Sequence, residues 1–336
     1  MNDRSAVFLL LAAAACDSGG SPPPPTAEVR PDVVITEDTM LAAASTAYRA
    51  ACAPTRALRS AVLLLELPPL GWEEPGAPPI GQAEPTEPEP PLVNPEIQIL
   101  DGPEGGTAIR TWDDRDGDDG YSTGDLFSVA FNDYGEGMAV LNGSVLFEGV
   151  TVAGDMIEGL TWMFAARCTL AVTLQVGDAV IPVSGSFRLD RQRRATVKTL
   201  ELELTAPLRV GVTIVAAGGR LARNDYTLDF TMAVFADGEV LDPVLGGTLA
   251  FHVEEPMTGV QVLADPMAGL LEVQGASEAV LTVRAIDFFN AELFFDPDAD
   301  EGGDESLPGV TTPIEYALLW NPPPEPLAEP MPAIAR

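Results

Sequence analysis

The sequence predicts a mainly β fold: one large curled antiparallel sheet, closed as a barrel or half-barrel or folded as a sandwich. Three observations support this prediction. Apolar and polar residues alternate along many short runs, turn-forming pairs accompany the runs, and a short helical segment lies near the N-terminus. We expect the helical segment to pack on the inner face of the sheet, because its apolar side must be covered.

Alternation with period two recurs between residues 96 and 320. In one run, Leu200, Leu202 and Leu204 alternate with Glu201 and Glu203. This pattern is typical of strands with one buried and one solvated face. Other runs place apolar residues in the same way: Phe127-Val129-Phe131, Trp162-Phe164-Ala166-Cys168, Tyr226-Leu228-Phe230-Met232-Val234 and Ile314-Tyr316-Leu318-Trp320.

Turn-forming pairs accompany these runs: Gly177-Asp178, Gly218-Gly219, Asn224-Asp225, Asp237-Gly238 and Asp265-Pro266. Runs joined by turns this short can only be antiparallel neighbours, because parallel strands need a long crossover connection.

Residues 36–67 form the predicted helical segment. Thr39 or Asp38 is suited to cap its start, and Pro54 is expected to stop the first helix. The apolar residues 57–67 then form a second helix or a buried strand.

Composition divides the chain into six segments. Two of them, residues 68–95 and 321–336, are rich in proline and glutamate, and we expect them to be disordered. The segments are a signal peptide (1–15), a tether (16–35), the helical segment (36–67), a disordered linker (68–95), the antiparallel β domain (96–320) and a disordered tail (321–336).

The N-terminus has the order of a secretory signal. Arg4 precedes an apolar run at residues 6–15, and small residues lead to Cys16. This segment resembles the bacterial lipoprotein signal, in which a cysteine at that place is lipidated, although Ala13 stands where leucine is usual. The resemblance implies a membrane anchor at Cys16. The alternatives are ordinary cleavage that leaves a soluble protein, and a wrongly assigned start.

The resemblance to lipoproteins also sets the expected location. We expect a lipid-anchored protein of the cell envelope that faces the periplasm or the exterior. Asp17, directly after the lipidated cysteine, favours the inner membrane, while the choice between inner and outer membrane stays open.

Charge excludes one class of partner. The chain has 51 acidic and 18 basic side chains, a net charge of −33. Nucleic-acid binding depends on neutralising phosphates with lysine and arginine, so we expect no nucleic-acid partner.

The cysteine count predicts one disulfide. The chain has three cysteines, and lipidation of Cys16 leaves Cys52 to pair with Cys168. Each of these two lies on the expected buried side of its own element, so a disulfide would pin the helical segment to the sheet. The alternative is two separately buried thiols.

Two acidic loops are candidate calcium sites. Oxygen-bearing residues of the first fall at positions 1, 3, 5, 9 and 12 of a calcium loop: Asp114, Asp116, Asp118, Ser122 and Asp125. Carboxylates of the second loop also alternate: Asp296, Asp298, Asp300 and Asp304. The first loop departs from the pattern, because Asp119 stands where a turn glycine belongs. The alternative for both loops is a solvated acidic turn; no other cofactor is expected.

Three segments resemble a group of uncharacterised β-rich lipoproteins of Gram-negative envelopes: DRDGDDGYSTGDLFSVAFNDY, LNGSVLF and QGASEAVLTVRAIDFFNAELFFDPDADEGGDE with the later YALLW. Such proteins join an acidic loop to a strand that begins Ser-x-Gly-Asp, here Ser122-Thr123-Gly124-Asp125. The resemblance implies no particular activity.

We expect no enzymatic activity. His252 is the only histidine, and alternation places it on the solvated face of its strand. The expected function is a non-enzymatic structural or interaction role in a membrane-anchored envelope lipoprotein. The alternative is a carrier of lipid or another apolar ligand, for which Trp162, Phe164, Phe230 and Met232 would line an open interior rather than fill it.

Overall fold

A single antiparallel sheet of 16 strands dominates the fold, as the alternation predicts. In this computed structural model the described residues are 31–68, 94–117, 120–157, 159–261, 265–276, 279–287, 289–296 and 310–322. The predicted signal peptide, most of the tether, most of the linker and most of the tail lie outside them.

Most strands pair with their neighbours in the chain, in the order β1 to β7 and then β10 to β16. The short strands β8 and β9 leave this path and bridge β6 to β11. The first seven strands are β1 (Glu96–Asp101), β2 (Thr107–Asp113), β3 (Leu126–Glu136), β4 (Ala139–Gly154), β5 (Thr161–Val176), β6 (Ala179–Arg194) and β7 (Val197–Glu203). The other nine are β8 (Leu208–Val210), β9 (Thr213–Val215), β10 (Arg220–Tyr226), β11 (Thr231–Asp242), β12 (Gly247–Val260), β13 (Ala268–Gln274), β14 (Val280–Ala285), β15 (Asn290–Asp296) and β16 (Val310–Glu315).

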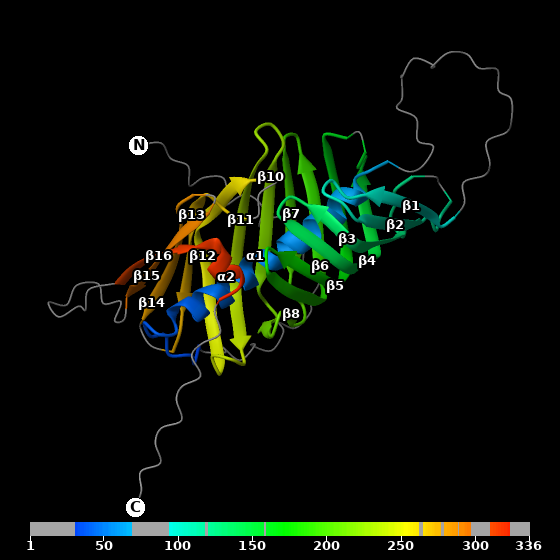
Figure 1. The fold of residues 1–336 in the computed structure, drawn as a ribbon. Coiled ribbons are helices and arrows are strands. Elements are labelled where there is room, and N and C mark those ends of the chain that lie inside the picture. Colours follow the sequence, from blue (N-terminus) through cyan, green and yellow to red (C-terminus); the bar gives the residue numbers. More distant parts are fainter. Residues whose placement is uncertain are drawn as a thin grey trace, which may run out of the picture.

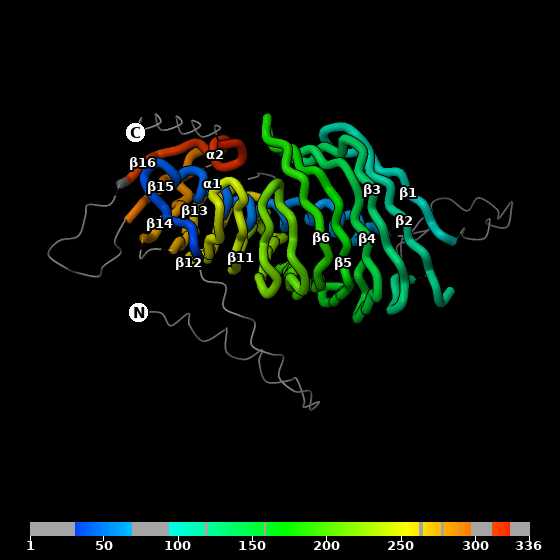
Figure 2. The backbone as a smooth tube through the Cα atoms, turned by 90° about the horizontal axis from the view of Figure 1, so that it is seen from below, coloured from blue at the N-terminus to red at the C-terminus, as the bar shows by residue number. Residues whose placement is uncertain are grey.

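One long helix, α1 (Met40–Leu65), lies inside the curve of the sheet. Figure 1 shows α1 running across the strands, and Figure 2 shows the strands curving around it. The helix packs against strands from β3 to β15, and 19 of its 26 residues are buried. The prediction of a curled sheet with a helix packed on it is therefore confirmed.

Alternation assigns the inner face correctly along the longest strands. In β5, every second residue from Trp162 to Val176 is buried, and most residues between them are exposed. The predicted turn at Gly177-Asp178 joins β5 to β6, whose residues pair in unbroken register. Inward side chains of this region form part of one continuous core around α1.

The expected break in the helix at Pro54 is wrong. Residues 57–65 continue α1, and both Pro54 and its neighbour Thr55 are buried. Proline removes one N–H donor, and its ring crowds the preceding turn of the helix. These two effects usually end a solvent-exposed helix. Here the sheet encloses the helix, and packing on many sides outweighs that local cost.

The run from Tyr226 to Val234 is a hairpin and not one strand. β10 ends at Tyr226 and β11 begins at Thr231, so Leu228 and Phe230 lie in the turn with 79% and 64% of their surface exposed. Apolar residues happen to keep period two across the turn, so alternation alone could not find it.

Two predicted turns are also wrong, because Asn224-Asp225 and Asp237-Gly238 lie inside β10 and β11. Near the C-terminus, residues 316–320 form the short helix α2 (Tyr316–Trp320) rather than a strand. At the other end, Val33 and Ile35 belong to the core, although we assigned them to the tether.

Candidate functional site

Charged residues meet in the interior between α1 and the sheet. We call this set the interior charge cluster. Its cations are Arg56, Arg59, Arg191, Lys198 and Arg223, and its anions are Glu66, Glu136, Asp225 and Asp265. They come from α1 and the residue directly after it, from strands β3, β6, β7 and β10, and from the segment between β12 and β13.

Glu66, directly after α1, receives two cations. Arg191 on β6 donates from Nε to Glu66 Oε1 at 3.0 Å, and its Nη2 lies 2.9 Å from the same oxygen. Lys198, the only lysine of the chain, donates to Glu66 Oε2. Because the side chain of Arg191 is 2% exposed, this pairing compensates a charge that is almost fully removed from water.

Asp225 is the second anion of the network. Arg223 Nε donates to its Oδ1 at 2.8 Å, and Arg191 Nη1 lies 3.5 Å from its Oδ2. Burial raises the pKa of Asp225, but the charges of Arg223 and Arg191 outweigh burial and hold the pKa below its ordinary value. Asp225 is therefore ionised and joins β10 to β6.

Asp265 ties α1 to the C-terminal helix α2. Its Oδ1 accepts a hydrogen bond from the hydroxyl of Tyr48 at 2.6 Å and another from Trp320 Nε1 at 2.7 Å. The Tyr48 and Trp320 rings meet edge to face, with centroids 5.3 Å apart. Burial raises the pKa of this carboxyl, while the two hydrogen bonds and the charge of Arg56 lower it.

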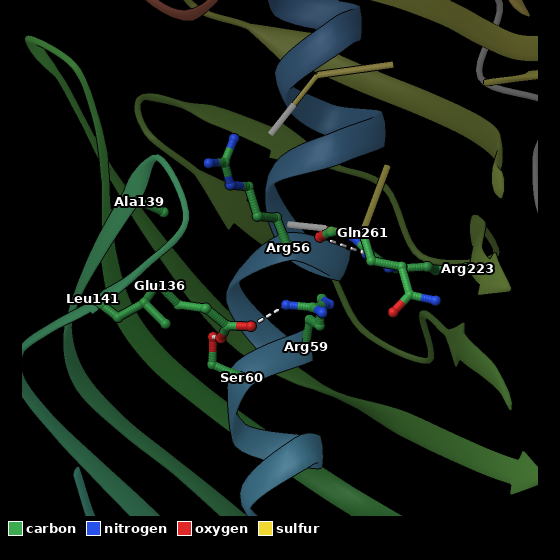
Figure 3. Close-up of a pocket in the computed structure, with 8 residues that line it drawn as sticks. All are labelled: Arg56, Arg59, Ser60, Glu136, Ala139, Leu141, Arg223 and Gln261. Atoms are coloured by element: carbon green, nitrogen blue, oxygen red, sulfur yellow. Dashed lines mark hydrogen bonds and ion pairs between the residues drawn. The ribbon is translucent and has the colours of Figure 1, made fainter. Parts of the chain in front are cut away.

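A small cavity opens among the arginines of the cluster. Figure 3 shows Arg56 and Arg59 extending from adjacent turns of α1, with Glu136 directed at Arg59. Arg59 Nη1 donates to Glu136 Oε1, and Ser60 donates to the other oxygen of that carboxylate. The cavity has a volume of about 20 Å³, enough for about one water-sized species.

Two nitrogen atoms at this cavity have no hydrogen-bond partner within the part of the chain that the structure describes. Arg56 Nη1 and Arg59 Nε are both removed from solvent and unpaired. Buried donors are nearly always paired, so these two indicate an interior that the protein's own side chains do not satisfy.

The first acidic loop brings three of its predicted ligands together. Asp114, Asp116 and Asp125 can each place one carboxylate oxygen within 4.8 Å of the others. Asp125 is 1% exposed and accepts hydrogen bonds from Trp112 Nε1 at 2.9 Å and from the Ser122 N–H at 3.0 Å. Asp125 therefore also organises the loop through its own hydrogen bonds.

Other predicted ligands cannot be placed. Asp118 lies outside the described residues, as do Asp298, Asp300 and Asp304 of the second loop. Asp296 is the last residue of β15. Calcium at either loop stays a prediction.

The predicted disulfide is wrong: Cys52 and Cys168 are both buried free thiols. Cys52 lies on the part of α1 next to Asp265 and Arg223, whereas Cys168 lies on β5. Strands β5 and β10 are three steps apart in the sheet, a separation of about 14 Å. Sharing the buried side of the fold did not bring the two sulfurs into reach of each other.

Both thiols are poor nucleophiles. Burial, with a smaller contribution from Asp265, raises the pKa of Cys52 to about 12. Burial likewise raises the pKa of Cys168 well above its ordinary value. Reactive cysteines need the opposite shift, toward the thiolate.

The sequence contains one Gly-x-Ser-x-Gly string, at residues 120–124, which the alternation and charge patterns do not single out. A nucleophile elbow stands between a strand and a helix, but here the string precedes β3. Ser122 hydrogen-bonds to Asp116 and Asp125. His252 is exposed on β12, where alternation places it, and the sheet order separates β12 from β3 by many strands.

Comparison with known proteins finds no matching family model, no matching curated protein and no matching solved structure. None of the helices in the described part of the chain has the length and apolar character that a membrane-spanning helix needs.

Asp225→Asn tests the interior charge cluster. We expect the free energy of unfolding at pH 7 to fall by about 3–5 kcal/mol, because the substitution leaves Arg223 and Arg191 buried without their shared anion. As a matched control, Asp190→Asn breaks the exposed pair with Arg188 and costs at most about 1 kcal/mol. Urea unfolding measures both, and equal stability of the two variants would contradict the network.

Acidification tests the same carboxylate. The ordinary pKa of Asp225 is 3.8, and its folded pKa is lower, so its stabilising contribution is complete above pH 3.8. That contribution is lost as the pH falls through the lowered value. The difference in unfolding free energy between the wild type and Asp225→Asn therefore narrows at low pH; a constant difference would argue against the assigned pKa direction.

Calcium titration tests the first acidic loop. Binding at Asp114, Asp116 and Asp125 predicts that millimolar Ca²⁺ raises the Tm of the full chain, because carboxylate oxygens are the ligands that calcium prefers. Asp116→Asn should remove the increase in Tm, because it removes one of the three carboxylates. Asp116 is chosen because it is the exposed member of the three. A wild-type Tm that does not change in millimolar Ca²⁺ would contradict the prediction.

Proposed function

We propose that this chain is a membrane-anchored lipoprotein of the cell envelope with a non-enzymatic structural or interaction role. The observation that carries the proposal is the occupancy of the concave face: α1 packs there against strands from β3 to β15, and 19 of its 26 residues are buried. The N-terminal signal pattern and Cys16 supply the proposed address and anchor.

The entry point of the chain into the fold supports an anchored domain. The Asp32 N–H donates to the Thr248 carbonyl at 3.1 Å, and the Ala276 N–H donates to the Val33 carbonyl at 2.7 Å. These contacts fix residues 32 and 33 beside β12 and β13. From Cys16 to this point the chain can span at most about 58 Å, so the domain would stay close to the membrane.

The side chains that would line an open interior in a carrier mostly fill the core instead. Trp162, Phe164 and Met232 are each at most 3% exposed, whereas Phe230 lies outside in a turn. Tyr48 of α1 is completely buried. These residues pack the interior where a carried ligand would have to lie.

One surface hollow keeps the carrier as a second candidate. It has a volume of about 580 Å³ beside β10, β11 and β12, and its lining includes Met232, Phe235, Val260 and Met267. This volume falls in the range of ligand pockets. A ligand there would bind at the surface and not inside the curled sheet.

The described residues offer little support for catalysis. The two buried thiols have raised pKa values, and His252 stands on the outer face away from them. A nucleophile and its base must lie within hydrogen-bond reach of each other. We therefore propose a role that needs no chemical step.

Cys16→Ser tests the anchor. The proposal predicts that the wild-type chain, expressed in a Gram-negative host, incorporates radiolabelled palmitate and fractionates with membranes. Cys16→Ser should lose the label and leave the membrane fraction, while Cys52→Ser keeps both. Equal labelling of wild type and Cys16→Ser would overturn the assignment.

Native mass spectrometry of the folded domain separates the structural or interaction role from the carrier role, because co-purifying lipid would favour the carrier.

A further inference from the structure

The cavity among Arg56, Arg59 and Arg223 has the properties of an anion site. Its lining combines these arginines with Ser60, Glu136 and Gln261. Arg56 Nη1 and Arg59 Nε are buried there, and neither has a hydrogen-bond partner among the described residues. We propose that the cavity binds one small monovalent anion of the size of chloride.

The charge balance of the interior supports this proposal. The interior charge cluster holds five cations and four carboxylates, which leaves one positive charge in excess. Glu66 takes Arg191 and Lys198, Asp225 takes Arg223, and Glu136 takes Arg59, so only Asp265 of the four carboxylates remains for Arg56. Asp265 attracts Arg56, but its Oδ1 already accepts hydrogen bonds from Tyr48 and Trp320.

Arg56 is the least compensated of the five cations. Its guanidinium carbon lies 5.5 Å from the centre of the Trp320 ring, and it forms no ion pair within 4.0 Å among the described residues. Burial lowers its pKa, Asp265 raises it, and the neighbouring charge of Arg223 lowers it again. A bound anion would offset both the loss of water and this repulsion.

Repulsion between the arginines points to the same place. Burial lowers the pKa of Arg223; its partner Asp225 raises that pKa, and the charge of Arg59 lowers it. Arg223 therefore lies close enough to both α1 arginines to feel their charges. An anion between them attracts each arginine and so offsets the repulsion of Arg223 with Arg56 and with Arg59.

Size and chemistry select the ligand. A volume of about 20 Å³ admits one water-sized species but not phosphate or a carboxylic acid. A water molecule could satisfy the two donors but would not offset the repulsion between the arginines. Glu136 also lines the cavity, where the ion pair with Arg59 offsets its charge and Ser60 binds its second oxygen.

Halide dependence of the melting temperature tests the proposal. The full chain is melted in sodium chloride, in sodium bromide and in sodium gluconate at equal ionic strength, because gluconate is too large for the cavity. We expect the halides to raise the Tm by about 2–5 °C over gluconate, and the shift to grow with halide concentration. Equal Tm values in all three salts overturn the proposal.

A pair of variants assigns the effect to the cavity. Arg56→Met keeps an unbranched apolar side chain but removes the guanidinium and its charge, so its Tm should be the same in chloride and gluconate. Arg188→Met, at a side chain that is 59% exposed, is the control and should keep the full halide shift. A halide shift that survives in Arg56→Met would contradict the assigned place.

Anomalous scattering gives an answer that needs no variant. A crystal of the wild-type chain grown in bromide should show an anomalous peak among Arg56, Arg59 and Arg223. Absence of the peak, with a water molecule in the cavity, overturns the proposal even if Arg56→Met fails to fold.

Discussion

Enclosure of α1 by the sheet is the constraint on which the rest of the structure depends. A 16-stranded sheet with one apolar face must cover that face, and here α1 packs against it from β3 to β15. Alanines make this feasible, because small side chains let strands approach the helix from several directions. Ala43, Ala47, Ala50 and Ala57 are completely buried, and alanine also favours the helix itself.

A helix enclosed in this way cannot turn its polar residues to water. Each must find a partner inside the fold, because a buried polar group without one is costly. Ser45 donates to the Leu319 carbonyl at 2.6 Å, Thr46 to Asp242, and Tyr48 to Asp265. The ion pairs of the interior charge cluster follow the same rule, so they fix the position of α1 along the sheet. The unpaired nitrogens beside the small cavity are the exception, and a bound anion would remove it.

Much of this architecture could be predicted from the sequence because alternation reports directly which face of a strand is buried. The same alternation places Arg191 in phase with Phe187 and Leu189, and so marks it as inward. The charge cluster was missed because a single inward arginine does not reveal its partner on another element. Partners such as Glu66 and Arg191 are 125 residues apart, and only the tertiary fold brings them together. For the same reason, the buried sides of α1 and β5 were predictable but the distance between their cysteines was not.

Amide hydrogen exchange tests the enclosure of α1 most directly. If packing against many strands holds the helix, the amides of residues 57–65 exchange only when the whole domain unfolds, with the same free energy as the central amides of β5 and β6. Pro54 would then cause no separate opening of the second half of the helix. Exchange of residues 57–65 at a free energy several kcal/mol lower than that of β5 would show that the helix leaves the sheet on its own, and would contradict the account.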